Sequence, residues 1–491
     1  MRRLALILII LVCQQLLASD GAEPTCVGTK GPVSLPIDGD AQSAFRMPSS
    51  IAWGDKDRID LDAFLFVPMT TVRNATNDFS QTSLGGGGTG GFIVSLPGTG
   101  MEDLAPSDPA PDPVFGRIQL HMGEYVEVGG ASGVSKLSSL TYPYGRNTET
   151  GLSLHTTAFT VAYAPVDWLG FGASFHFIYG QLKAKSIIGG GTAPLNGSPH
   201  INGVPIPGNP TYTDFLNLFQ TGQLGDPATY VNTSNMTSFQ VSGEIALSIR
   251  PWKNLGFGIS YEPRSLILQD FQGTALVDAR QTVALAINPL APPIQNLFLA
   301  TLPDGGRNGY LSQFKIKVKG IHTPETVRLS AAWWITDRIL VAGEVAWYEW
   351  TRALAPVATL SGGNNRDLNF MIGNPSVVTS VKVGWSNEWV WSLYSSFGVT
   401  DDLAVRLGFN YGGMPVNADY LGDGPNSAIV SMTLTAGVGY KILPGLEVSV
   451  MCEYSPYCSI HSDGLPQSVS SRYANYSARQ FLAHLGVGYE F

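Results

Sequence analysis

The sequence repeats one pattern along most of its length: two segments of alternating apolar and polar residues, joined by a very short turn and followed by a long irregular loop. The short turns lie near residues 165–168, 251–254, 336–338, 400–402 and 443–445. The long loops lie at about 188–235, 274–312, 353–378, 412–430 and 457–478. Short turns at one end of the strands and long loops at the other are typical of β-barrels that span an outer membrane.

The alternation has a period of two, so each predicted strand has one apolar face. Leu255, Phe257 and Ile259, for example, alternate with small residues. The opposite faces carry charged residues, which are costly against lipid but suit a wet or plugged lumen: Glu244, Glu262, Arg328, Glu344, Arg406 and Glu447. Tryptophans near both strand ends indicate two interfacial girdles. A large soluble all-β protein, the alternative, also alternates but does not place aromatics at both ends.

We predict an all-β fold, a membrane-spanning antiparallel β-barrel of about 14 strands. An even number returns the C-terminus to the periplasmic side, and the sheet must close so that every backbone group in lipid is paired. The last strand ends on the aromatic Phe491, a feature that barrel assembly machinery reads. The predicted strands are 57–68, 90–97, 116–128, 150–164, 168–187, 236–250, 254–273, 313–335, 338–352, 379–399, 402–412, 430–441, 445–456 and 479–491.

The N-terminus predicts export. Two arginines precede an apolar run from Leu4 to Val12 and then small residues, which is typical of a cleaved signal peptide over residues 1–22. We assign 23–50 to a hatch in the lumen and 51–491 to the barrel, located in the cell outer membrane. In that oxidising compartment two arrangements of the cysteines remain possible. Either Cys452 and Cys458 form a disulfide, or Cys26, Cys452 and Cys458 are all unpaired thiols.

Composition and motifs favour a protein without catalytic chemistry. The net charge of −9 argues against a nucleic-acid partner. The sequence has no phosphate-binding loop, zinc-binding helix or nucleophile elbow, so we predict no enzyme, no cofactor and no metal. His155 and His176 are expected on lumen faces of neighbouring strands, which leaves a lumen lipid hydrolase as an alternative.

The two longest loops are too apolar to be disordered. Five of their residues recur at helical spacing and are predicted to bind a hydrophobic ligand: Leu216, Phe219, Ile294, Leu297 and Phe298. They form either an open groove that captures the ligand or a lid in which the loops bury each other's side chains.

The second half of the chain resembles the FadL/TodX family of outer-membrane transporters for long-chain fatty acids and aromatic hydrocarbons. The resemblance rests on Thr323–Arg328, Trp333–Arg338, Trp347–Trp350, Asp401–Gly408 and Met414–Val416. It implies an N-terminal hatch, whose place is taken here by Asp38, Asp40, Arg46 and Pro48, with Met47 where the family has asparagine.

The residues that bind a fatty-acid carboxylate in the family do not carry over directly. Gln181, followed by Lys183 and Lys185, stands where an arginine is expected, and Arg352 is the cation nearest to the expected lysine. The sequence therefore predicts a passive transporter whose partners are a hydrophobic small molecule, outer-membrane lipids and lipopolysaccharide. A structural or adhesive surface barrel with a closed lumen is the alternative from another class.

Overall fold

The structure is a computed structural model. It describes residues 33–37, 39–54, 56–75, 77–82, 84–96, 118–137, 146–189, 197–202, 204–211, 214, 228–278, 280, 288, 291–301, 311–361, 376–380, 385–416, 429–462 and 473–491. The predicted signal peptide lies outside the described residues, and so do Asp38, Leu216 and Phe219.

Strands make up most of the described chain. Its helices include α2 (Ser43–Arg46), the 3-10 helix η1 (Pro48–Ile51), α5 (Pro292–Ala300) and α6 (Trp350–Ala353). The strands are β1 (Arg58–Arg73), β2 (Asp78–Thr82), β3 (Gly85–Leu96), β4 (Ile118–Leu137), β5 (Arg146–Val166), β6 (Leu169–Gly189), β7 (His200–Ile201), β8 (Val204–Pro205), β9 (Ala228–Thr233), β10 (Met236–Trp252), β11 (Leu255–Glu262), β12 (Leu266–Asp278), β13 (Leu311–Ile321), β14 (Glu325–Thr336), β15 (Ile339–Glu349), β16 (Leu354–Ser361), β17 (Ser376–Ser380), β18 (Glu388–Gly398), β19 (Leu403–Gly412), β20 (Met432–Leu443), β21 (Leu446–Ser462) and β22 (Ala474–Glu490).

Antiparallel pairing closes these strands into a membrane-spanning barrel, which confirms the predicted fold class. The circuit of pairings within the described residues runs through fourteen strands, namely β1, β3, β4, β5, β6, β10, β11, β14, β15, β18, β19, β20, β21 and β22, which returns to β1. No helix among the described residues is long and apolar enough to cross a membrane.

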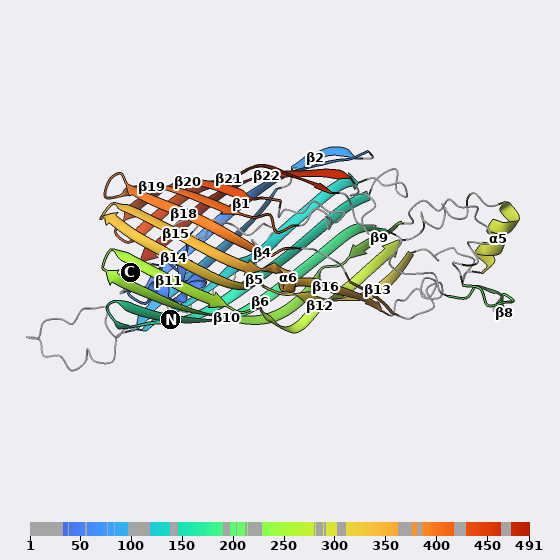
Figure 1. The fold of residues 1–491 in the computed structure, drawn as a ribbon, viewed down its shortest axis with the longest axis horizontal. Helices are drawn as coiled ribbons and strands as arrows, with labels where there is room; N and C mark the ends of the chain where they lie inside the picture. The colour runs from blue at the N-terminus through green and yellow to red at the C-terminus, as the bar shows by residue number, and fades with distance from the viewer. Residues whose placement is uncertain are drawn as a thin grey trace, which may run out of the picture.

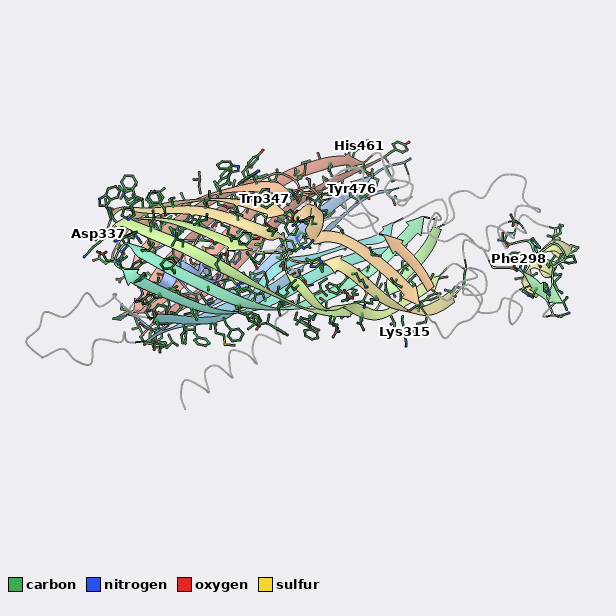
Figure 2. The ribbon with its side chains drawn as sticks, turned by 60° about the horizontal axis from the view of Figure 1, so that its bottom comes forward. Phe298, Lys315, Asp337, Trp347, His461 and Tyr476 are labelled. Atoms are coloured by element: carbon green, nitrogen blue, oxygen red, sulfur yellow. The ribbon has the colours of Figure 1, made fainter. Side chains whose placement is uncertain are left out.

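The two ends of the barrel differ as the loop lengths predict (Figure 1). The short turns lie at one end, where the backbone N–H of Glu490 donates to the carbonyl of Gly445. Helix α5 and the β7–β8 hairpin lie beyond the strands at the opposite end. Figure 2 shows the same separation between Asp337, in a short turn, and Phe298, on α5.

The outer surface of the barrel is apolar. Along β6, Phe171, Phe175 and Phe177 are exposed, whereas the even-numbered residues between them are buried. Exposed tryptophans lie near both strand ends, with Trp168 and Trp252 beside short turns and others on β18. Exposed apolar side chains flanked by aromatic girdles are the surface that a barrel presents to lipid.

Three of the predicted continuous strands are interrupted, which corrects the sequence prediction. The segment predicted at 254–273 divides into β11 and β12 at Pro263, and 313–335 divides into β13 and β14 before Pro324. Proline has no N–H for the ladder and restricts the residue before it. The segment at 338–352 ends in α6, after which β16 continues into the predicted long loop.

The fold predicts which turns reach the cell surface. Gly208 has a φ of +88°, and among the described residues only its chain neighbours come within 4 Å of the position that a Cβ would take. An epitope tag inserted there should be reached by antibody on intact cells, because the site is open. A tag inserted at Pro444, in the β20–β21 turn, should be reached only after the outer membrane is opened. Labelling of Pro444 insertions on intact cells would contradict this orientation.

Candidate functional site

Three layers lie one above another inside the barrel, and strand β6 passes all of them. Three of its inward-facing residues mark the layers, counted from the short-turn end. Gly172 contacts the N-terminal segment (residues 33–37 and 39–54), His176 lies beside charged side chains, and Ile178 lies among apolar side chains. Strand β10 repeats this order with Ser248, Glu244 and Met236. The three layers are therefore stacked along the barrel axis.

The N-terminal segment forms the layer nearest the short turns and is largely buried. The hydroxyl of Ser49, in η1, is hydrogen-bonded to that of Ser248 at 2.7 Å. Gly172 on β6 has no side chain because a Cβ there would meet the backbone of Pro48 and Ser49. A glycine that permits close backbone approach is a common reason for glycine within a strand.

The same segment is attached to the opposite side of the wall. The backbone N–H of Ala41 donates to Asp60 at 2.9 Å, and the Tyr125 hydroxyl donates to the carbonyl of Ala41 at 2.6 Å. Phe45 stacks on Tyr125 with 4.2 Å between ring centroids. The segment therefore fills this part of the lumen and contacts strands from both sides.

The charged layer (His176, Glu244, Glu262, Arg328 and Glu344) lies above this segment. Arg328 donates to Glu244 at 3.0 Å and lies 3.9 Å from Glu262, which in turn lies 3.0 Å from Nδ1 of His176. Glu344 accepts the backbone N–H of Ser34 at 3.0 Å, so it links the charged layer to the N-terminal segment. Buried charges persist only where they are paired, and here three carboxylates surround one guanidinium.

The apolar lining is the layer nearest the long loops. It consists of buried side chains from β5, β6, β10, β12, β13, α6 and β16: Leu154, Ile178, Met236, Phe271, Ala275, Ile316, Val318, Ile321, Trp350, Ala353, Leu354 and Ala358. These residues were missing from the predicted site. They give the long-loop half of the barrel an apolar inner surface, the type of surface that binds hydrophobic small molecules.

One signal in the sequence indicates an apolar interior near the long loops. Along a single strand, the apolar residues change from the outward-facing positions to the inward-facing positions. In the membrane-spanning part of β22, His484 points inward and Leu485 is exposed. Nearer the long loops, Tyr476 is buried and Arg479 is exposed. Strand β13 shows the second pattern throughout, since lysines alternate with buried Phe314, Ile316 and Val318.

The strand interruptions lie at the boundary between the charged layer and the apolar lining. Side chains replace part of the backbone ladder there. The Gln240 amide donates to the carbonyl of Ile321 at 2.9 Å, and the Ser265 hydroxyl donates to Gln240 at 2.6 Å. The backbone N–H of Thr323 donates to Ser265 at 2.9 Å. The wall is thus held by fewer backbone bonds at this level than above or below it.

Three of the residues predicted to belong to a hatch lie together in the N-terminal segment. Asp40 is fully buried, and its carboxylate accepts the backbone N–H of Ser43 at 2.7 Å. The carbonyl of Arg46 accepts a hydrogen bond from Ser260 at 3.1 Å, and Pro48 begins η1.

Four of the predicted ligand-binding residues are described by the structure, and they lie at two places. Ile294, Leu297 and Phe298 lie on α5, beyond the strand ends (Figure 1). Phe298 is fully buried, whereas Leu297 is 38% exposed. Arg352 lies on α6 in the barrel wall, where it is exposed and pairs with Glu325 at 3.3 Å and Glu349 at 2.7 Å.

The expectation that His155 faces the lumen is wrong. On β5 the even-numbered residues Leu154, Thr156 and Ala158 are the buried ones, so His155 lies on the opposite face from the lumen and cannot pair there with His176. Lys183 and Lys185 share the outward face of β6 with Phe177, so they do not take the place of a lumen arginine.

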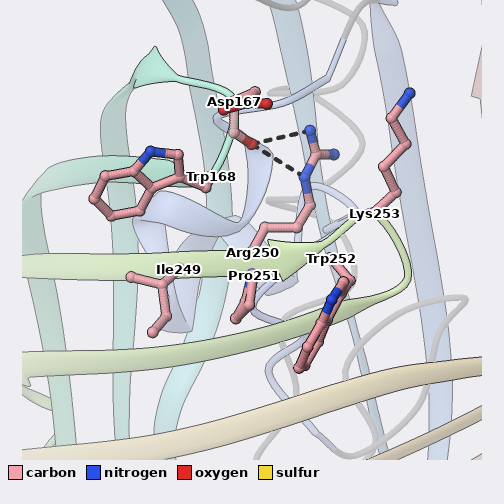
Figure 3. Close-up of a pocket in the computed structure, with 7 residues that line it drawn as sticks. All are labelled: Asp167, Trp168, Ile249, Arg250, Pro251, Trp252 and Lys253. Carbon is pink, nitrogen blue, oxygen red and sulfur yellow. Dashed lines mark hydrogen bonds between the residues drawn. The ribbon is translucent and has the colours of Figure 1, made fainter.

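A recess of about 480 Å³ opens at the short-turn end, between the β5–β6 and β10–β11 turns (Figure 3). Arg250 donates to the carbonyl of Asp167, and its guanidinium lies 5.0 Å from the ring of Trp53 in the N-terminal segment. Trp168 and Trp252 flank the recess and are exposed. The recess belongs to the interfacial rim rather than to the layers of the lumen.

Solved structures of two toluene transporters and of a FadL homologue have the same fold as this chain. The Pseudomonas putida toluene transporter TodX matches with a TM-score of 0.65 at 14% identity, over 94% of this chain and 97% of that one. The Ralstonia pickettii toluene transporter TbuX matches with a TM-score of 0.62 at 13% identity, over 96% and 99%. A Pseudomonas aeruginosa FadL homologue matches with a TM-score of 0.64 at 12% identity, over 96% and 99%.

The resemblance to the FadL/TodX family is therefore confirmed at the level of the fold. No protein-family model matches the chain, and no curated protein sequence matches it.

The contact between Gly172 and η1 predicts that a single methyl group will displace the N-terminal segment. A Gly172→Ala variant should lose about 1–3 kcal/mol of folding free energy, the usual effect of overpacking, and should conduct ions better in planar lipid bilayers. The Gly343→Ala variant is the control, because its new Cβ would meet its nearest neighbour at an ordinary 3.5 Å. Equal conductance of the two variants would contradict the contact.

Proposed function

We propose that this chain is an outer-membrane channel through which uncharged hydrophobic small molecules pass without being chemically changed. The observation that carries the proposal is the apolar lining, because a barrel that conducts only water-soluble solutes has a polar lumen. A ligand that removes about 200 Å² of apolar surface from water gains roughly 5 kcal/mol. The likeness of the fold to toluene transporters supports the same conclusion.

The charged layer favours a ligand without a carboxylate. Glu244 and Glu262 lie beneath the apolar lining, and the guanidinium of Arg328 is already paired with both. A carboxylate entering from above would lose its hydration and meet carboxyl groups and a guanidinium that is already paired. A neutral hydrocarbon meets neither cost, so we place aromatic hydrocarbons ahead of fatty acids.

We assign the first capture of the ligand to the long loops. Leu297 presents apolar surface on α5, with Ile294 partly exposed beside it, while the buried Phe298 holds the helix in place. Leu216 and Phe219 remain proposed members of this capture surface, outside the described residues. Arg352 lies apart from α5, and we keep it as a proposed contact at the wall.

We infer that the ligand leaves through the side of the barrel rather than past the N-terminal segment, the proposed hatch. The hatch is hydrogen-bonded to strands on both sides of the lumen, and its movement would break these bonds together. The interruptions around Pro263 and Pro324 lie directly at the floor of the apolar lining. Separation of the wall there breaks mainly side-chain hydrogen bonds.

Two alternatives are less well supported. In a structural or adhesive barrel with a closed lumen the apolar lining would serve only for packing, and the likeness of the fold to toluene transporters favours transport instead. A lumen hydrolase needs a histidine beside a nucleophile that a ligand can reach. His176 is turned towards Glu262, with Phe45 against its ring, and His121, which lies 3.0 Å from the buried hydroxyl of Thr160, is held by Tyr125 beside the N-terminal segment.

Uptake of a panel of aromatic hydrocarbons and long-chain fatty acids by cells that express the protein tests the proposed function. Wild-type cells should take up the hydrocarbons faster than the fatty acids. Phe271→Asp should lower uptake at least about tenfold, because it removes apolar contact and adds a charge that must lose its water. Leu297→Asp on α5 should lower uptake only at low ligand concentration, since it affects capture.

The matched control is Gln272→Asp, because Gln272 adjoins Phe271 on β12 but is exposed. Phe271→Leu should retain uptake, and heat-modifiability of each variant reports folding. If the wild type takes up none of the panel, or if Phe271→Asp folds and behaves like Gln272→Asp, the lining does not carry the ligand.

A disulfide that fixes the hatch tests the exit route. Ser49→Cys with Ser248→Cys places two thiols where the hydroxyls now lie 2.7 Å apart, in a chain whose Cys26, Cys452 and Cys458 are replaced by serine. Hydrocarbon uptake should be the same within about twofold in the oxidised and reduced forms, because a side exit needs no hatch movement. Loss of uptake on oxidation and its recovery on reduction would show that the hatch must move.

A further inference from the structure

A row of three lysines stands on the outer surface of β13. Lys315, Lys317 and Lys319 alternate with the buried Phe314, Ile316 and Val318, so all three point away from the lumen. Figure 2 shows Lys315 at the outer edge of the barrel, on the side towards the long loops. The row is cationic in a chain whose net charge is −9.

The neighbouring strand β12 locates the row relative to the membrane. Leu266 and Leu268 are 70% and 65% exposed, as expected of lipid-facing residues, and the next outward positions are Asp270 and Gln272. Gln272 pairs with Lys317. The lysines therefore stand beside the polar outward positions that follow Leu268, which we assign to the level of lipid headgroups, and Leu276 is the next apolar outward residue of β12.

Two ordinary reasons for lysines on a strand do not account for Lys315 and Lys319. Lysines protect the free edges of sheets, but β13 is paired with β12 on one side and with β16 on the other. Ion pairing within the described residues accounts for Lys317, which lies 2.8 Å from Asp270. The residues of β16 that pair with the row are uncharged, among them Val357 and Thr359.

We propose that this row, Lys315, Lys317 and Lys319, binds the phosphate groups of a phosphorylated glycolipid in the outer leaflet. Ammonium groups at alternate positions of one strand are spaced about 7 Å apart, so neighbouring lysines can contact two phosphates of one headgroup. Leu266 and Leu268 lie below them to contact the acyl chains. The site is separate from the lumen and does not depend on what the barrel transports.

Binding of lipid A to the purified barrel in detergent, measured by native mass spectrometry, tests the proposal. The triple variant Lys315→Gln/Lys317→Gln/Lys319→Gln should bind bisphosphorylated lipid A at least about tenfold more weakly than the wild type, because each lysine near an anionic surface contributes separately. The triple Lys→Arg variant should bind as the wild type does. Lipid A without phosphates should bind the wild type as weakly as the bisphosphorylated form binds the glutamine variant.

Lys253→Gln with Lys441→Gln, at the short-turn end, is the control and should leave binding unchanged. Heat-modifiability reports folding, and the comparison of lipids on the wild-type protein decides the question even where the glutamine variant does not fold. Equal binding of the two lipids by the wild type, or unchanged binding by the folded glutamine variant, would overturn the proposal. Displacement of bound lipid A by inorganic phosphate alone would show a site for the free anion instead.

Discussion

The structure depends on one constraint: in lipid, every backbone N–H and C=O must find a partner within the protein. The closed circuit of antiparallel pairs meets this constraint from β1 to β22 and back. Where prolines and α6 interrupt the ladder, Gln240, Ser265 and Thr323 supply side-chain or local hydrogen bonds in its place. The interrupted part of the wall, around Pro263 and Pro324, borders the apolar lining. The part of the wall with the fewest backbone hydrogen bonds is therefore also the proposed exit for the ligand.

Strand alternation serves two different purposes along the barrel axis. In the membrane it directs apolar side chains to lipid and charged ones to the lumen, as Leu485 and His484 show. Towards the long loops the pattern reverses, and the lumen becomes apolar while lysines and arginines face outward. A hydrophobic molecule thus finds an apolar surface inside the protein at the height where the outside is polar.

Much of the fold could be predicted because it follows from local periodicity. The strand predicted at 168–187 is observed at Leu169–Gly189, and that predicted at 236–250 at Met236–Trp252. The interruptions were missed although Pro263 and Pro324 were visible, because alternation continues on both sides of them. The candidate site was predicted poorly because it depends on contacts between distant segments. Nothing near Gly172 in the sequence indicates that Pro48 packs against it. The sequence places Arg352 near the position of the expected lysine, but it does not show that the side chain turns to Glu325.

We propose that the apolar lining holds a hydrophobic ligand inside the barrel. Anomalous diffraction from crystals of the protein soaked with a brominated aromatic hydrocarbon tests it most directly, because bromine locates the ligand without assumptions about its orientation. The account predicts a bromine peak within contact distance of Phe271, Ile316 and Trp350, above the charged layer. Bromine peaks confined to the lipid-facing surface or to α5, with none inside the barrel, would contradict it.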